Sequence, residues 1–223
     1  MEIVVATKNK GKIKEIQEVL EGLNIRVLSP DDLGLEIDVE EDGKTYIENA
    51  VKKAVEVTKR ARKIALADDS GLEIDALNGR PGINSSRFAG DDADDRERNL
   101  KILEMMKDVP HEKRGARFKC VIAVATPPLN PPLTSPFSPP SEGGEGEVVK
   151  GGAGGVYTCE GVCEGEIAEE IRGDKGFGYD PIFIVSEYGK TFGELGAEIK
   201  NKISHRAKAM EKAVEVLMSL EDN

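Results

Sequence analysis

The chain has 223 residues, of which 39% are apolar and 33% charged; this composition predicts one compact domain over 1–223 and excludes a disordered chain. Its apolar runs are too short to cross a bilayer, so we expect no membrane partner, and the first residues lead us to expect no signal peptide. Three cysteines without a CxxC pair indicate a reducing, cytoplasmic setting, and a formal net charge of −11 disfavours a nucleic acid polymer as partner, because each backbone phosphate needs a cation.

Strands and helices alternate along the chain, which predicts an α/β fold. Thr45 and Glu48 have the spacing of a capping box at a helix start, and Ser204 is a second candidate N-cap. The apolar periodicity predicts strands over 3–6, 63–67, 72–76, 117–126, 156–160, 164–172 and 181–185, and helices over about 12–22, from 45, over about 94–107 and from 204. Residues 127–155 hold seven of the 11 prolines and seven glycines, so we expect a flexible insertion with no part in the chemistry.

A lysine-rich segment follows the first strand and consists of Thr7, Lys8, Asn9, Lys10, Gly11 and Lys12. Because a helix is predicted to start here, its free amide groups and positive dipole end meet further positive charge, which is unfavourable unless an anion binds. A polyphosphate would neutralise both, and Gly11 would let it approach the backbone closely. The alternative is a solvated lysine cluster. The sequence contains no Walker loop of the form GxxxxGK[ST].

Asp68 and Asp69 lie side by side at the end of an apolar run. Two desolvated neighbouring carboxylates repel each other unless a cation lies close to them. Magnesium prefers one or two carboxylates together with water and substrate phosphates, and the acidic segment 38–42 could supply another ligand. The alternative is that Asp-Ser-Gly is only a turn sequence. If the lysine-rich segment binds phosphate, the metal-binding interpretation of Asp68 and Asp69 is favoured over the turn.

Two segments in the second half of the chain could contact an anion or a base. His205 and Arg206 fall in the first turn of the last predicted helix, where donors suit an anion or a carbonyl oxygen. In the segment 176–181, glycines flank an aromatic residue, and Phe177 or Tyr179 could stack on a base. Each segment also has an ordinary explanation, namely a surface His–Arg pair and a tight turn around a packed Phe.

Taken in order, these segments resemble the inosine triphosphate pyrophosphatase family, the XTP/dITP diphosphatases that act on non-canonical purine nucleoside triphosphates. No single motif is unique, but the set in this order is specific, and the resemblance reaches almost from end to end. The motifs are ATKNKGK at 6–12, YIENA at 46–50, ADDSGL at 67–72, PGINSSR at 81–87, GFGYDP at 176–181 and SHRAKA at 204–209.

The resemblance implies an elongated mixed β-sheet with flanking helices, two lobes around a central cleft, and a homodimer. It implies that Mg²⁺ is the cofactor and that Asp69 is both the catalytic proton acceptor and a metal ligand. Glu40 would be the second ligand, although the neighbouring Glu41 leaves the alignment open there. The small-molecule substrate, a purine nucleoside triphosphate, would contact the segment 7–12 and Ser70, Phe177, Gly178, Tyr179, Asp180, Lys200, His205 and Arg206.

The implied reaction is the hydrolysis of ITP, dITP or XTP to the monophosphate and pyrophosphate. Two alternatives stay open: a nucleotide-binding sensor without turnover, which would not need the Asp68–Asp69 pair, and a related pyrophosphatase for pyrimidine or modified triphosphates, which the helix start at Ser204 argues against. The sequence departs from the family in Lys8, where many members have glycine, and in the length of the insertion after Thr126.

Overall fold

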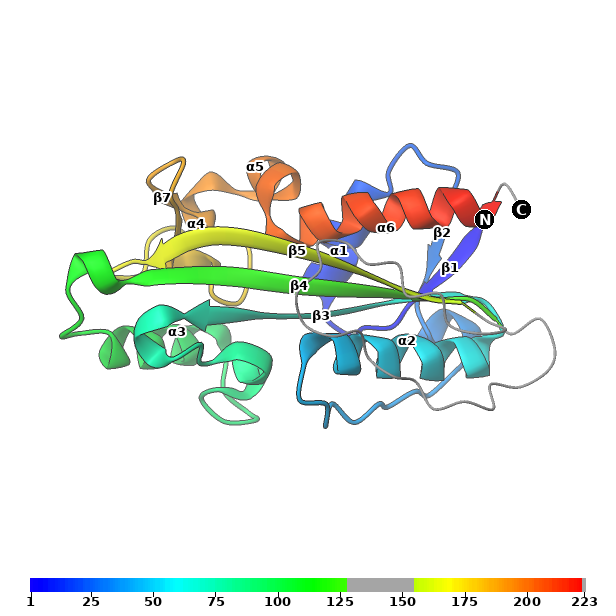
Figure 1. The fold of residues 1–223 in the computed structure, drawn as a ribbon, viewed down its shortest axis with the longest axis horizontal. Coiled ribbons are helices and arrows are strands. Elements are labelled where there is room, and N and C mark those ends of the chain that lie inside the picture. The colour runs from blue at the N-terminus through cyan, green and yellow to red at the C-terminus, as the bar shows by residue number, and fades with distance from the viewer. Residues whose placement is uncertain (128–154, 222–223) are drawn as a thin grey trace. The chain divides into compact units, whose positions relative to one another are not determined.

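The computed structural model describes residues 1–127 and 155–221 (Figure 1). The strands of this part of the chain form one mixed sheet in the order β2-β1-β3-β4-β5-β6-β7, in which β1 pairs in parallel with β2 and β3, and β6 pairs antiparallel with β5 and β7. The expected α/β fold, a mixed sheet with flanking helices, is confirmed. The insertion predicted at 127–155 lies outside the described residues except for its two ends, and the cleft between two lobes stays a prediction.

The strands are β1 (Glu2–Val5), β2 (Arg26–Leu28), β3 (Ile64–Ile74), β4 (Gly115–Ala125), β5 (Val156–Ile167), β6 (Phe183–Val185) and β7 (Lys190–Thr191). The α-helices are α1 (Lys10–Val19), α2 (Tyr46–Ala61), α3 (Asp95–Met105), α4 (Phe192–Leu195), α5 (Ala197–Ile203) and α6 (His205–Glu221). Short 3₁₀ helices cover Asp31–Leu33, Asp75–Leu77, Gly82–Arg87, His111–Lys113 and Asp180–Ile182. None of the helices in the described ranges has the length and apolar character needed to cross a membrane.

The chain divides into two compact units, each built from separate segments of sequence. The first unit comprises Met1–Asp69, Cys120–Glu160 and Lys208–Asn223, and the second comprises Ser70–Lys119 and Gly161–Ala207. The boundary therefore falls inside β3, β4 and β5.

The first unit buries apolar side chains of β1, β3, β4 and β5 against helices. Alternation along β1 places Ile3 and Val5 on the face covered by α1 and the C-terminal part of α6. Figure 1 shows α2 on the other side of the sheet. The core on the α1 and α6 side contains Ile3, Val5, Ile16, Leu20, Leu66, Cys120, Ile122, Val124, Cys159, Ala209, Met210, Ala213 and Leu217.

The second unit has its own core, centred on aromatic rings. The ring centroids of Phe118 and Phe183 are 4.5 Å apart, and those of Phe183 and Phe192 are 5.7 Å apart. Such pairs contribute beyond their buried area. The remaining core is Leu72, Ile74, Leu77, Ile102, Met106, Ala116, Cys163, Ile167, Tyr179, Ile182 and Val185.

Two strand predictions are wrong. Residues 68–71 do not form a turn: β3 continues through them from Ile64 to Ile74, because the aspartate side chains find polar partners and the backbone stays extended. The strands predicted at 156–160 and 164–172 are one strand, Val156–Ile167, which ends earlier than expected.

The helix starts at Thr45 and Ser204 are confirmed. Thr45 Oγ1 accepts a hydrogen bond from the Glu48 N–H at 3.1 Å, and Ser204 Oγ accepts one from the Ala207 N–H at 3.1 Å. The capping box is incomplete, however, because the Glu48 carboxylate accepts from the Lys44 N–H at 2.6 Å and not from the N-cap itself.

Candidate active site

The lysine-rich segment connects β1 to the first turn of α1. Asn9 is the N-cap of this helix, since its Oδ1 accepts a hydrogen bond from the Lys12 N–H at 3.1 Å, and Thr7 Oγ1 accepts from the Asn9 N–H at 3.2 Å. The first turn contains Lys10 and Lys12 and no acidic residue. Positive side chains at the positive end of a helix dipole are unfavourable, so this helix start favours a bound anion.

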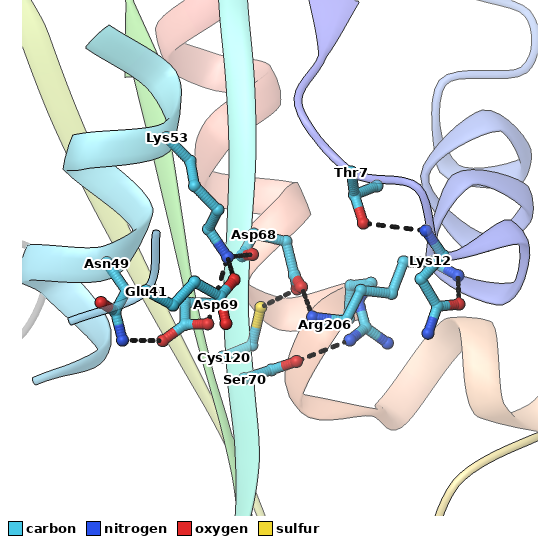
Figure 2. A network of polar contacts seen from close by, with 11 residues as sticks. Thr7, Lys12, Glu41, Asn49, Lys53, Asp68, Asp69, Ser70, Cys120 and Arg206 are labelled. Carbon is cyan, nitrogen blue, oxygen red and sulfur yellow. Dashed lines mark hydrogen bonds and ion pairs between the residues drawn. The ribbon is translucent and has the colours of Figure 1, made fainter. Parts of the chain in front are cut away.

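Lys12 differs from the other lysines of this segment. Lys8 and Lys10 are exposed, whereas the Lys12 side chain is mostly buried and its ammonium forms an ion pair with Asp68 Oδ1 (Figure 2). The other carboxylate oxygen, Asp68 Oδ2, accepts a hydrogen bond from Cys120 Sγ at 3.0 Å. A buried carboxylate is thus held by one ammonium and one thiol.

The ammonium of Lys53 is the centre of a second buried polar group. Lys53 Nζ lies 3.2 Å from Asp69 Oδ1, 2.6 Å from Glu41 Oε1 and 2.7 Å from the carbonyl oxygen of Asp68. Asn49 Nδ2 donates to Asp69 Oδ2 at 3.2 Å. We call Glu41, Asn49, Lys53 and Asp69 the Lys53 cluster; Figure 2 shows its side chains converging on β3.

Burial sets the ionisation of this cluster. Burial raises the pKa of the Asp69 carboxyl above its ordinary value, although the ammonium groups of Lys53 and Lys12 act in the opposite direction. Burial alone would lower the pKa of Lys53, but the carboxylates of Asp69 and Glu41 outweigh it and that pKa is raised. Lys53 therefore stays protonated at neutral pH, and Asp69 binds a proton more strongly than an exposed aspartate does.

The donor chemistry of the Lys53 cluster fits a hard divalent cation. The carboxylates of Glu41 and Asp69 already share one cation, the Lys53 ammonium, and carboxylate oxygens are the ligands that magnesium prefers. Glu40 is exposed, so Glu41 is the acidic neighbour that lies with Asp69. Within residues 1–127 and 155–221, no group of three or more His, Cys, Asp or Glu side chains is close enough to hold a metal by itself.

In the second unit, several predicted residues contact one another around the ring of Phe177. The Lys200 ammonium lies 4.3 Å from the ring centroid and the Arg206 guanidinium 5.8 Å from it. Asp180 Oδ2 accepts from Lys200 Nζ at 2.6 Å and from the Phe177 N–H at 2.9 Å. Arg206 donates to Ser70 Oγ at 2.9 Å. We call these five residues the Phe177 cluster; it combines an aromatic face with two cations.

Two further predicted residues belong to the core of the second unit. Tyr179 is buried and its hydroxyl donates to the carbonyl oxygen of Ser85 at 2.8 Å; burial raises the pKa of that hydroxyl. His205 is buried and its ring stacks on Phe118, with centroids 4.6 Å apart. Phe177 is only half-buried, so it is the more accessible of the two aromatic rings considered for stacking.

Sequence reasoning missed Asn49 and Lys53. Asn49 appeared only within the motif YIENA, without a role, and Lys53 was not considered. Both lie on the buried stripe of α2 at positions 46, 49, 50, 53 and 57. Two polar side chains at i and i+4 on a buried stripe were the signal that could have found them, because a buried amide or ammonium needs a partner.

These features together define an α/β protein with a lysine-rich helix start and a buried carboxylate–ammonium cluster. Comparisons with known proteins then identify its family. Residues 3–216 match the Ham1 family. The chain is 46% identical over 220 residues to the dITP/XTP pyrophosphatase of Desulforamulus reducens, covering 99% of this chain and 97% of the relative. It is 44% identical over 216 residues to the protein of that name in Bacillus subtilis, covering 97% and 96%.

A solved structure of a HAM1 protein from Coxiella burnetii has the same fold, with a TM-score of 0.79, 42% identity, and coverage of 98% of this chain and 99% of that one. The chain therefore belongs to the Ham1 family, and the resemblance seen in the sequence is confirmed.

The Lys53 cluster generates a prediction about stability. Replacing Lys53 by Met leaves the buried Asp69 carboxylate without its nearest cation, which should lower the free energy of unfolding by about 3 kcal/mol at pH 8. Removal of the cation raises the folded-state pKa of Asp69 further above its unfolded value of about 4. Because that carboxyl is then protonated more readily in the folded state, the loss should be smaller at pH 5 than at pH 8.

Urea denaturation at both pH values measures this difference. The matched control is Lys52→Met, because Lys52 is the preceding residue of α2 and pairs with Asp42 at the surface. We expect little change in the control at either pH. Equal losses in both variants, or a Lys53→Met loss that does not vary with pH, would contradict the proposed coupling.

Proposed function

We propose that the protein hydrolyses non-canonical purine nucleoside triphosphates, such as ITP, dITP and XTP, to the monophosphate and pyrophosphate. The observation that carries this proposal is the buried Asp69 carboxylate, whose pKa is raised. The residue before it, Asp68, forms an ion pair with Lys12 at the lysine-rich start of α1. The names of the relatives from Desulforamulus reducens and Bacillus subtilis agree with the proposal. Removing such triphosphates would keep the nucleotide pool clean.

The triphosphate is bound at the start of α1. The segment 7–12 supplies lysine ammonium groups and the free amide groups of the first turn, which neutralise phosphate oxygens. Lys12 then exchanges part of its contact with Asp68 for a phosphate oxygen. The lysines also stabilise the charge that develops on the leaving pyrophosphate.

Asp69 is the general base in this mechanism. Its carboxylate takes a proton from a water molecule whose oxygen attacks the α-phosphorus, and the bond from that phosphorus to the bridging oxygen of the β-phosphate breaks. The products are the nucleoside monophosphate and pyrophosphate. Burial strengthens Asp69 as a base, while Lys53 keeps it ionised and Asn49 orients it.

We propose magnesium as the cofactor, held by Asp69 and by Glu41 in preference to the exposed Glu40. When bound, magnesium neutralises phosphate charge and makes water more acidic. The fit rests on the two carboxylates that already share the Lys53 ammonium.

The Phe177 cluster is the proposed base site. The half-buried ring of Phe177 offers a face for stacking, and Arg206 or His205 would donate to a 6-oxo group. Adenine would instead present its 6-amino group to a donor, and such a mismatch rejects the wrong base strongly. We further propose a homodimer, which the family resemblance supports, and a cytoplasmic setting, which agrees with three cysteines that form no disulfide.

Pyrophosphate release from ITP, dITP, XTP, ATP, GTP and CTP with magnesium tests the function directly. We expect the hypoxanthine and xanthine nucleotides to have the highest kcat/KM. Tight binding of ITP without any turnover would identify a sensor, and preference for CTP would identify a pyrimidine enzyme; either result would overturn the proposal.

Replacing Asp69 by Asn should lower kcat by about 10²–10⁴-fold, because the amide cannot accept the proton of the attacking water. ITP binding, measured by calorimetry, should persist within a few-fold. The control is Asp42→Asn, which changes an exposed aspartate paired with Lys52. Full activity of the Asp69→Asn variant would exclude this residue as the base.

Replacing Lys12 by Ala should raise KM for ITP by about tenfold or more, because a charge-assisted contact to phosphate is lost. Lys12→Gln keeps the reach of the side chain and controls for the loss of packing against Asp68. Lys14→Ala changes an exposed lysine two residues further along α1 and should leave KM unchanged. A KM that does not respond to either Lys12 variant would mean that the phosphates bind elsewhere.

A further inference from the structure

Two side chains of α3 bind one residue of the Phe177 loop, here defined as residues 176–180. Asp95 Oδ2 accepts a hydrogen bond from the Gly178 N–H at 2.7 Å, and Asn99 Nδ2 donates to the Gly178 carbonyl oxygen at 3.0 Å. Asp95 and Asn99 are four residues apart and therefore lie on the same face of the helix. Both backbone polar groups of Gly178 are thus bound by the same helix.

The Phe177 loop needs such support. Gly176 and Gly178 have φ angles of 79° and 62°, in the left-handed region, and glycine loses the most conformational freedom when it is fixed. Gly178 lies directly between Phe177 and Tyr179, so fixing its two peptide groups restricts the backbone on which the Phe177 ring is carried. Inside the loop, Asp180 binds the Phe177 N–H at 2.9 Å.

Burying the Asn99 amide has an energetic cost. Asn99 is 2% exposed, and its Oδ1 has no hydrogen-bond partner among the described residues. A buried acceptor without a partner opposes stability, and an apolar side chain of similar size would avoid that cost. The amide is therefore best explained by what its Nδ2 group does, which is to hold the Gly178 carbonyl.

We propose that Asp95 and Asn99 are positioning residues for the nucleobase: they fix Gly178 and thereby hold the Phe177 ring ready to stack on a purine. The inference rests on the proposed function and adds two residues that do not contact the phosphates. If the loop is ordered before the ligand binds, binding does not have to pay the entropic cost of ordering it. Asp95 and Asn99 should therefore affect binding of the base and not the chemical step.

The test compares ligands with and without a base. Asp95→Ala and Asn99→Leu should each raise KM for ITP and the inhibition constant of inosine monophosphate by about tenfold, the effect of one lost charge-assisted or buried hydrogen bond. The inhibition constant of inorganic tripolyphosphate, which has no base, should stay unchanged, and kcat should change by less than about threefold.

Matched variants separate positioning from general damage. Asp95→Asn retains an acceptor oxygen for the Gly178 N–H and should recover most of the loss seen in Asp95→Ala. Glu104→Ala removes an exposed acid from the same helix and should behave as wild type. Asn99→Leu should keep its thermal midpoint within a few degrees, so it remains informative if Asp95→Ala folds poorly.

Two outcomes would overturn the inference: an unchanged KM for ITP in Asn99→Leu, or equal weakening of inosine monophosphate and tripolyphosphate. Failure of the wild-type protein to hydrolyse any nucleotide would instead refute the proposed function. The two failures are therefore distinguishable.

Discussion

The arrangement of the first unit depends on one buried charge, the ammonium of Lys53. An isolated ammonium is costly to bury, and here it is compensated by the Asp69 and Glu41 carboxylates and by the Asp68 carbonyl oxygen. These partners come from β3 and from the segment before α2, so a single charge joins the helix to the strand and to that segment. The same contacts determine how strongly Asp69 binds a proton, and a general base needs both a defined position and a suitable pKa.

A second compensation of charge lies at the start of α1, where we propose that the phosphates bind. Without a ligand, Lys12 is neutralised by Asp68, whose other oxygen is held by the Cys120 thiol. Lys8 and Lys10 are exposed and remain near the positive end of the helix dipole. Of Lys8, Lys10 and Lys12, Lys12 is the one that is mostly buried in an ion pair. The folded chain therefore keeps an unfavourable concentration of positive charge at this helix end, which a polyphosphate would relieve.

In the second unit, the aromatic ring of Phe177 is carried by a loop with two glycines in the left-handed region. Such a loop is mobile unless its peptide groups are bound. Asp180 binds the loop from within, Asp95 and Asn99 bind it from α3, and Tyr179 anchors the next position in the core. Preorganisation of this kind lowers the cost of binding a flat ligand.

Local sequence determined the lysine-rich helix start, the Asp68–Asp69 pair and the helix that begins after Ser204, because charge at a helix end and neighbouring carboxylates are visible within a few residues. It did not show that β3 continues through Asp69, since the partner that stabilises this carboxylate in a strand lies in α2. Only the tertiary structure showed that Glu41 contacts Lys53 while Glu40 is exposed, and only it revealed the contacts of Lys53 and Asn99. Their contacts join positions 16 and 79 residues apart in the chain, and no local pattern encodes which distant atom a buried polar group will meet.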